Sequence, residues 1–235
     1  MTVTEIMTEL EVKGSDNIKK IFLKHGVKEP FFGVKIEYLK VIEKKIKKDH
    51  ALALQLYATG NADAMYLAGL IADDSKMTRE DLKNWAQMAV STNINSYTLP
   101  WVAAGSQLGF EMALQWIDAK EEHIAVAGWA TLGGIAAIKP DTEIDLLVYK
   151  KLLNRVGTEI HSARNFEKQA MNNFVIAVGT YIAALSEETK AVAKDIGTVR
   201  ADMNGTACKV PLASDYIQKA VDKGIVGRKK KKLKC

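Results

Sequence analysis

Two pairs of basic residues have a spacing suited to phosphate binding. Lys151 and Arg155 are four residues apart, and Arg164 and Lys168 repeat that spacing. Residues four apart lie on one face of a helix, so each pair could hold neighbouring phosphate groups with charge-assisted hydrogen bonds. The alternative is that both pairs belong to solvated helix faces that bind nothing.

Residue patterns for other kinds of chemistry are incomplete. Gly128 and Gly133 have the glycine spacing of a phosphate-binding P-loop, but Gly134-Ile135 stands where that motif needs lysine and serine or threonine. The four histidines have no ligand partner three or four residues away, and the two cysteines do not form a Cys-x-x-Cys pair. We therefore expect no metal, no cofactor and none of these enzyme types.

The positive charge of the chain is concentrated at its C-terminus. The formal net charge is +5, and the segment Gly227–Cys235 alone carries six basic residues, which leaves −1 for the rest. Such a run favours a polyanionic partner such as nucleic acid; a disordered, solubilising tail is the alternative. The first residues lack the cationic and apolar regions of a signal peptide, so we expect a cytoplasmic protein with no membrane partner.

Almost every segment has a helical pattern. The most apolar one, Ile124–Ile138, has no charged residue between Glu122 and Lys139 and is too short to cross a membrane. A helix that is apolar on all sides must be buried on all sides, which predicts a central helix. The predicted helices are 4–12, 17–25, 34–48, 50–58, 62–73, 79–90, 97–108, 110–118, 124–138, 142–156, 165–185, 187–196 and 215–223, with Thr78 and Ser214 as caps of the helices that follow them.

A weak internal repeat relates two of the predicted helical pairs. Ala53-Leu54-Gln55 recurs as Ala113-Leu114-Gln115, and Ala68-Gly69 recurs as Ala127-Gly128. Stacked helical pairs form an α-solenoid with an extended concave binding surface. Chance similarity between alanine-rich helices is the alternative. We predict an all-α fold, an α-solenoid with one C-terminal β-hairpin, in a single domain (1–226) followed by a basic tail (227–235).

The hairpin is predicted at residues 198–210. Asn204-Gly205 at its centre is a strong signal for a tight turn, because both residues tolerate a positive φ. Arg200 and Lys209 would lie on its two strands, and a β-ribbon can enter a DNA groove. A structural cap on the last helical pair is the alternative role.

Two adjacent asparagines, Asn172 and Asn173, interrupt an apolar helical segment. Asparagine is a poor residue for a helix interior, so a specific role is expected. Either the two side chains face a binding groove, or they form hydrogen bonds to a neighbouring repeat.

The sequence resembles a known family. The run Phe31-Phe32-Gly33-Val34 before a basic amphipathic helix, the succession of helical pairs and the junction Thr92–Trp101 are similar to those of the AlkD-type DNA alkylation repair proteins. The resemblance covers roughly residues 17–185. It implies a solenoid of HEAT-like repeats that grips DNA, in a family whose glycosylases remove cationic N-alkylated purines.

The resemblance also shows where this sequence departs from the glycosylases. Their Trp-Asp-x-x-Asp-like segment corresponds here to Asn93–Thr98, with Ile94 replacing the tryptophan and Thr98 replacing the essential aspartate. No Asp or Glu occurs between Asp81 and Glu111, so no nearby acid can substitute. A hydroxyl cannot supply the negative charge that a cationic transition state needs. The family's second aromatic falls at Phe174, and its basic residue falls near Ala127-Gly128.

We therefore expect a DNA-binding protein of this superfamily that holds duplex or branched DNA through phosphates without base excision, as the resemblance implies for relatives that lack the acid. The alternatives are an N-alkylpurine glycosylase that uses other residues and a protein-interaction scaffold. The residues expected to contact DNA are Lys151, Arg155, Arg164, Lys168, Asn172, Asn173, Arg200, Lys209, Arg228, Lys229 and Lys230.

Overall fold

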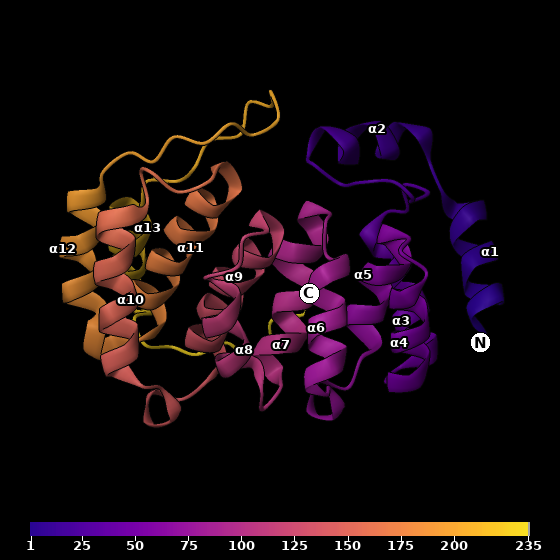
Figure 1. Cartoon of the computed structure of the whole chain (residues 1–235), viewed down its shortest axis with the longest axis horizontal. Coiled ribbons are helices and arrows are strands. Elements are labelled where there is room, and N and C mark those ends of the chain that lie inside the picture. The colour runs from indigo at the N-terminus through magenta and orange to yellow at the C-terminus, as the bar shows by residue number, and fades with distance from the viewer. Residues whose placement is uncertain (235) are drawn as a thin grey trace. The chain divides into compact units, whose positions relative to one another are not determined.

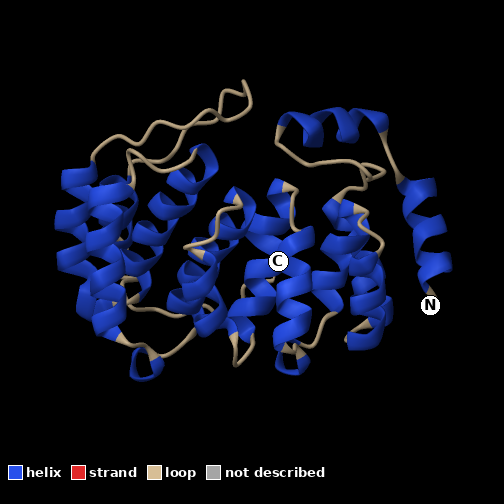
Figure 2. Cartoon of the chain, in the orientation of Figure 1, coloured by secondary structure: helices blue, strands red, loops and turns tan. Residues whose placement is uncertain are grey.

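The structure, a computed structural model, describes residues Met1–Lys234, so Cys235 of the predicted tail lies outside the described residues. The described chain is helical, with loops between the helices (Figures 1 and 2). It divides into two compact units. Unit 1 comprises Met1–Met112 with Asn204–Thr206 and Lys234, and unit 2 comprises Ala113–Met203 with Ala207–Leu233.

Unit 1 is built from short helices that polar side chains initiate. Thr2 and Glu5 form a capping box, as do Thr78 and Asp81, and the side chain of Asn61 caps another helix. The elements are α1 (Val3–Lys13), α2 (Asp16–Lys24), α3 (Ile36–Ile46), α4 (His50–Ala58), α5 (Ala62–Ile71), η1 (Asp74–Lys76), α6 (Arg79–Met88), η2 (Ile94–Thr98) and α7 (Leu99–Gly105). Helix α8 (Gly109–Trp116) begins in unit 1 and ends in unit 2.

The core of unit 1 forms around α5, whose residues are all buried. The Tyr57 ring stacks on that of Trp85 with centroids 3.8 Å apart, and its hydroxyl donates to the Trp85 carbonyl over 2.9 Å. Buried Asp63 on α5 accepts hydrogen bonds from the backbone N–H groups of Phe32 (2.7 Å), Gly33 (3.0 Å) and Val34 (3.3 Å). The run Phe31–Val34 is therefore a loop that this carboxylate fixes to α5.

Unit 2 is organised around α9 (Glu122–Ile138). The predicted all-round burial of this apolar helix is confirmed, since most of its residues are buried, with Trp129 fully enclosed. Gly128 permits a close approach, because a Cβ there would lie 2.7 Å from the backbone nitrogen of Ile117. The other elements are η3 (Asp141–Glu143), α10 (Leu146–Glu159), α11 (Asn165–Tyr181), η4 (Ala183–Leu185), α12 (Ser186–Ile196) and α13 (Ala213–Asp222).

The predicted β-hairpin at 198–210 is wrong. No strand occurs in residues 1–234, and Figure 2 shows a loop between α12 and α13. The turn itself is confirmed, since Asn204 and Gly205 have φ values of 57° and 68°. Helix α11 takes backbone groups that a strand ladder would use. Asn165 donates to the Asp202 carbonyl (2.6 Å) and accepts from its N–H (2.7 Å), and Asn172 donates to the Pro211 carbonyl (2.9 Å).

Smaller differences concern helix ends. Ser214 lies within α13 and does not cap it, because the helix begins one residue earlier at Ala213. The predicted helix 97–108 is shorter, and the π-helical turn η2 precedes it. The predicted helix 142–156 begins later, where the Asp145 side chain caps α10 by accepting from Leu147 and Val148.

Candidate nucleic-acid interface

The segment Asn93–Thr98, where the sequence resemblance implies the catalytic segment of the glycosylases, contains the single π-helical turn of the described chain. Ile94 and Thr98 are completely buried, so neither position presents a side chain to a ligand. The Thr98 hydroxyl donates to the Asn93 carbonyl over 3.4 Å. At position 98, where the resemblance implies the essential acid of the glycosylases, the structure thus has a neutral and inaccessible group.

Close packing against α5 explains why Thr98 is inaccessible. A Cβ on Gly69 would lie 2.3 Å from Cγ2 of Thr98, so the glycine lets the two backbones approach. A larger or charged residue at position 98 would have to displace α5 or lose its solvation. The local geometry therefore opposes an acid at this position.

Tyr97 is the exposed side chain of this segment, with 56% of its surface accessible. Its ring lies 6.1 Å from that of Trp101, which in turn meets the buried Tyr66 ring edge-on at 5.4 Å. Tyr97 was not among the residues expected to contact DNA. The available signal was an aromatic residue between two polar residues, Ser96 and Thr98, in an otherwise apolar or amide-rich segment.

Basic residues lie next to this segment. The Thr92 hydroxyl donates to the His25 carbonyl over 2.5 Å, and the Lys28 N–H donates to Oγ of Ser91 over 2.8 Å. These bonds fix the loop after α2 to the residues that precede η2. The side chains of Lys24, His25 and Lys28 are exposed there.

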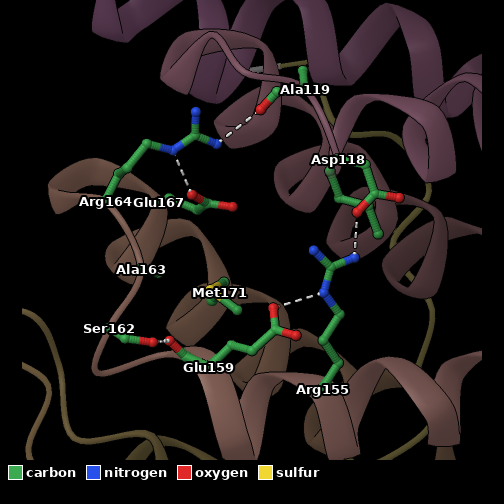
Figure 3. Close-up of a pocket in the computed structure, with 10 residues that line it drawn as sticks. Asp118, Ala119, Arg155, Glu159, Ser162, Ala163, Arg164, Glu167 and Met171 are labelled. Atoms are coloured by element: carbon green, nitrogen blue, oxygen red, sulfur yellow. Dashed lines mark hydrogen bonds and ion pairs between the residues drawn. The ribbon is translucent and has the colours of Figure 1, made fainter.

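A pocket of about 410 Å³ in unit 2 contains the two arginines that we expected to bind phosphate. It is lined by the turn between α8 and α9, the end of α10 and the start of α11 (Figure 3). Arg155 binds two acids there, Asp118 through Nη1 (2.7 Å) and Glu159 through Nε (2.8 Å). Its guanidinium also lies 5.6 Å from the centroid of the buried Trp129 ring.

Arg164 connects the pocket wall to the preceding turn. Its Nε binds buried Glu167 at 2.8 Å, and one terminal nitrogen donates to the carbonyl of Ala119 over 3.1 Å (Figure 3). The other terminal nitrogen donates to the carbonyl of Lys120. The Trp129 indole also donates to Glu167 over 3.3 Å. Both arginines are therefore engaged by acids or carbonyls of their own unit. The spacing of Glu159 and Glu167, four and three residues after the arginines, was a sequence signal for this pairing.

The other expected contacts on α10 and α11 differ in accessibility. Lys151 is exposed and Lys168 is half-buried. Asn173 is exposed, whereas Asn172 is fully buried and anchors the loop after α12. Of the two roles considered for the pair, hydrogen bonding within the fold therefore fits Asn172.

The positions to which the resemblance assigns the family's remaining site residues are also buried. Phe174 lies between two rings, with centroids 5.2 Å from Trp129 and 5.7 Å from Tyr149. Ala127 and Gly128 are buried in α9 and provide no positive charge. Neither position offers a side chain to a DNA strand.

The loop after α12 and the C-terminal tail contain both exposed basic side chains and basic side chains that are bonded within the fold. Arg200, Lys209, Arg228 and Lys230 are exposed, and the Lys230 ammonium lies 5.5 Å from the Tyr181 ring centroid. Lys229, by contrast, binds Asp141 at 2.7 Å and the Ala136 carbonyl at 2.9 Å. That carbonyl belongs to the last turn of α9, where a cation interacts favourably with the helix dipole.

Within Met1–Lys234, no group of three or more His, Cys, Asp or Glu residues is arranged to hold a metal ion. None of the described helices is long and apolar enough to cross a membrane.

Helical pairs with buried second helices, such as α4 with α5, define a helical-repeat protein. The sequence matches the family described as DNA alkylation repair enzyme over residues 6–209, and the chain belongs to this family. The resemblance found in the sequence is thereby confirmed.

Two relatives and one solved structure extend this assignment. Uncharacterised proteins of Listeria innocua and Listeria monocytogenes are each 30% identical, covering 94% of this chain and 97% of their own. A solved structure with a TM-score of 0.91 and 34% identity covers 100% of both chains. It represents a new family of proteins related to the HEAT-like repeat DNA glycosylases with affinity for branched DNA structures. The fold of the present chain is therefore an all-α HEAT-like repeat.

Proposed function

We propose that this protein binds branched DNA through its phosphates and does not excise bases. The absence of base excision is supported by Thr98, a buried neutral residue where the resemblance implies the catalytic acid. No Asp or Glu occurs from Lys83 to Phe110. Without a carboxylate, the cationic transition state of base excision lacks its electrostatic stabilisation.

Binding to branched DNA is supported by the similarity to a solved structure from a family with affinity for branched DNA. Exposed basic residues that can neutralise phosphates are present on α10, in the loop after α12 and in the tail: Lys151, Arg200, Lys209, Arg228 and Lys230. We give Arg155, Arg164, Asn172 and Lys229 structural roles in our proposal, since each is bonded within its own unit.

Binding that depends on phosphates must weaken as salt increases, because each neutralised phosphate releases bound counterions. We would titrate the protein against a fluorescent four-way junction and a linear duplex of matched sequence, at two salt concentrations. Tighter, salt-sensitive binding to the junction is expected. Absence of binding at low salt would contradict the proposal and favour a protein partner.

The loop tip offers a test of selectivity for branched DNA. Replacing Asn204 and Gly205 by alanines removes the residues that adopt positive φ easily, so the tip should change its conformation. We expect weaker junction binding with little change for linear duplex. Alanine at exposed Lys209 is the control and should weaken binding to both substrates. If the tip variant lost the same affinity for junction as for linear duplex, a selective role of the tip would be contradicted.

A further inference from the structure

A row of three aromatic rings runs from the core of unit 1 to its surface. Tyr66 is buried, and its ring meets Trp101 edge-on at an interplanar angle of 83°. Trp101 is half-buried and supports the ring of Tyr97, which is exposed. Tyr97 therefore presents an aromatic surface that is supported from below and open to a ligand.

The backbone that carries Tyr97 is fixed on both sides of this residue. Ile94 and Thr98 are buried, and Thr98 is in close contact with α5 at Gly69. π-helical turns are rare and are frequently found at functional sites. Because the ring is already positioned, a ligand that stacks on it loses little conformational entropy.

Exposed lysines lie on the loop that is bonded to the residues just before η2. The loop that contains Lys28 is bonded to Ser91, and Lys24 precedes the same loop. Tyr97 follows Ser91 by six positions, in the helical segment that begins at Thr92 and continues as η2. Lysines that bind phosphates next to an aromatic residue that stacks on bases are the combination with which proteins bind unpaired nucleic acid.

We propose that Tyr97 stacks on an unpaired base at the branch point of a DNA junction, while Lys24 and Lys28 contact the adjacent phosphates. This inference rests on the proposed function and adds the part of the DNA that is recognised. Every base has a π-face, so the contact requires no particular sequence. A fully paired linear duplex keeps its bases stacked inside and offers Tyr97 no partner.

The test uses two three-way junctions that differ only at the branch point. One carries two unpaired adenines there, and the other has abasic sites in their place. The wild type should bind the adenine junction about tenfold more tightly, the usual scale of one stacked base. Tyr97→Ala should bind the two junctions equally, and Tyr97→Phe should retain the preference because its ring can still stack.

Two further variants separate stacking from general effects. Tyr216→Ala removes a tyrosine of similar exposure, 49%, on α13 and should retain the tenfold preference. Lys28→Ala should weaken binding to both junctions by the same factor. Equal wild-type affinity for both junctions, or a preference that persists in Tyr97→Ala, would overturn the inference. Failure of the wild type to bind any junction at low salt would instead contradict the proposed function.

Discussion

At the scale of single residues, burial decides what the segment around η2 can do. Thr98 has no accessible surface, and its neighbour Tyr97 has more than half of its surface exposed. Close packing around Thr98 leaves no space in which an acid at this position could be solvated. Tyr97 is the residue of η2 that remains available to DNA.

The first residue-scale prediction concerns restoration of the acid. Thr98→Asp should not produce excision of N-alkylated purines, and it should lower the free energy of unfolding by about 3–5 kcal/mol, because it buries an unpaired charge. Urea unfolding and release of free base from alkylated DNA would measure the two effects. Thr98→Val, which removes only the long hydrogen bond to the Asn93 carbonyl, should cost about 1 kcal/mol. A stable Thr98→Asp variant that releases alkylated purines would contradict our explanation.

The second residue-scale prediction concerns Asp63. Burial raises the pKa of Asp63, although the N–H groups of Phe32, Val34 and Gly33 and the charge of Lys19 act in the opposite direction. An acid with a raised pKa in the folded state stabilises the fold fully below the ordinary carboxyl pKa, and this contribution is lost as pH rises through the raised value. The stability advantage of wild type over Asp63→Asn should therefore decrease from pH 4 towards pH 7.

Urea unfolding of both proteins across this pH range would measure that difference. Asp63→Ala serves as the reference in which the acceptor is removed completely, and it should cost about 3 kcal/mol because it leaves buried N–H groups unpaired. A constant difference between wild type and Asp63→Asn would show that burial does not control this carboxylate.

At the scale of elements, the sequence predicts the helices and turns that depend on residues close together in the chain. Apolar periodicity and capping residues predicted nearly all the helices, including the buried α9 and the capping box of Thr78 and Asp81. The turn at Asn204-Gly205 was also local and correct. The strands beside it were wrong: Asn165 of α11 bonds to both backbone groups of Asp202 within the predicted hairpin, and such a distant pairing leaves no local signal.

The same limit applied to the candidate site. The sequence alone shows that position 98 carries no acid. The exposure of Tyr97, however, depends on a π-helical turn that no simple periodicity predicts. Lys229 is engaged by Asp141, 88 positions earlier in the chain. In each case, tertiary contacts determine which polar side chains remain available to a ligand.

The element-scale prediction concerns the C-terminal tail, whose lysines differ in their contacts. Lys229 and Lys234 have side chains only 19% and 16% exposed, and Lys234 binds Asp74 at 2.6 Å and the Ala72 carbonyl at 2.9 Å. Alanine at either position should lower the free energy of unfolding by about 1–2 kcal/mol, since charged hydrogen bonds are removed. Urea unfolding would measure this change.

Exposed Lys231 and Lys232 are the matched comparison. Alanine at these positions should leave stability within about 0.5 kcal/mol of wild type. It should also flatten the logarithmic salt dependence of DNA binding by about 0.9 for each phosphate that the tail no longer neutralises. A destabilisation as large as that of Lys229→Ala, or an unchanged salt slope, would show that the two kinds of lysine do not have different roles.

At the scale of the whole molecule, the repeat explains how one chain combines a family fold with an altered site. Ala68-Gly69 and Ala127-Gly128 lie in α5 and α9, both almost completely buried, and each glycine allows a neighbouring segment to approach closely. The contact at Gly128 is made with Ile117, whereas the contact at Gly69 is made with Thr98 itself, so in unit 1 the packing of α5 depends on a small residue at that position. The family fold is therefore compatible with a protein that binds DNA without cleaving its glycosidic bonds.

The central claim, preference for branched DNA, is tested most directly by competition. A fluorescent four-way junction bound to the protein would be displaced by unlabelled junction or by unlabelled linear duplex, compared at equal phosphate concentration so that general charge attraction is matched. We predict displacement by the junction at a far lower concentration than by the duplex. Equal displacement by the two competitors would contradict the claim.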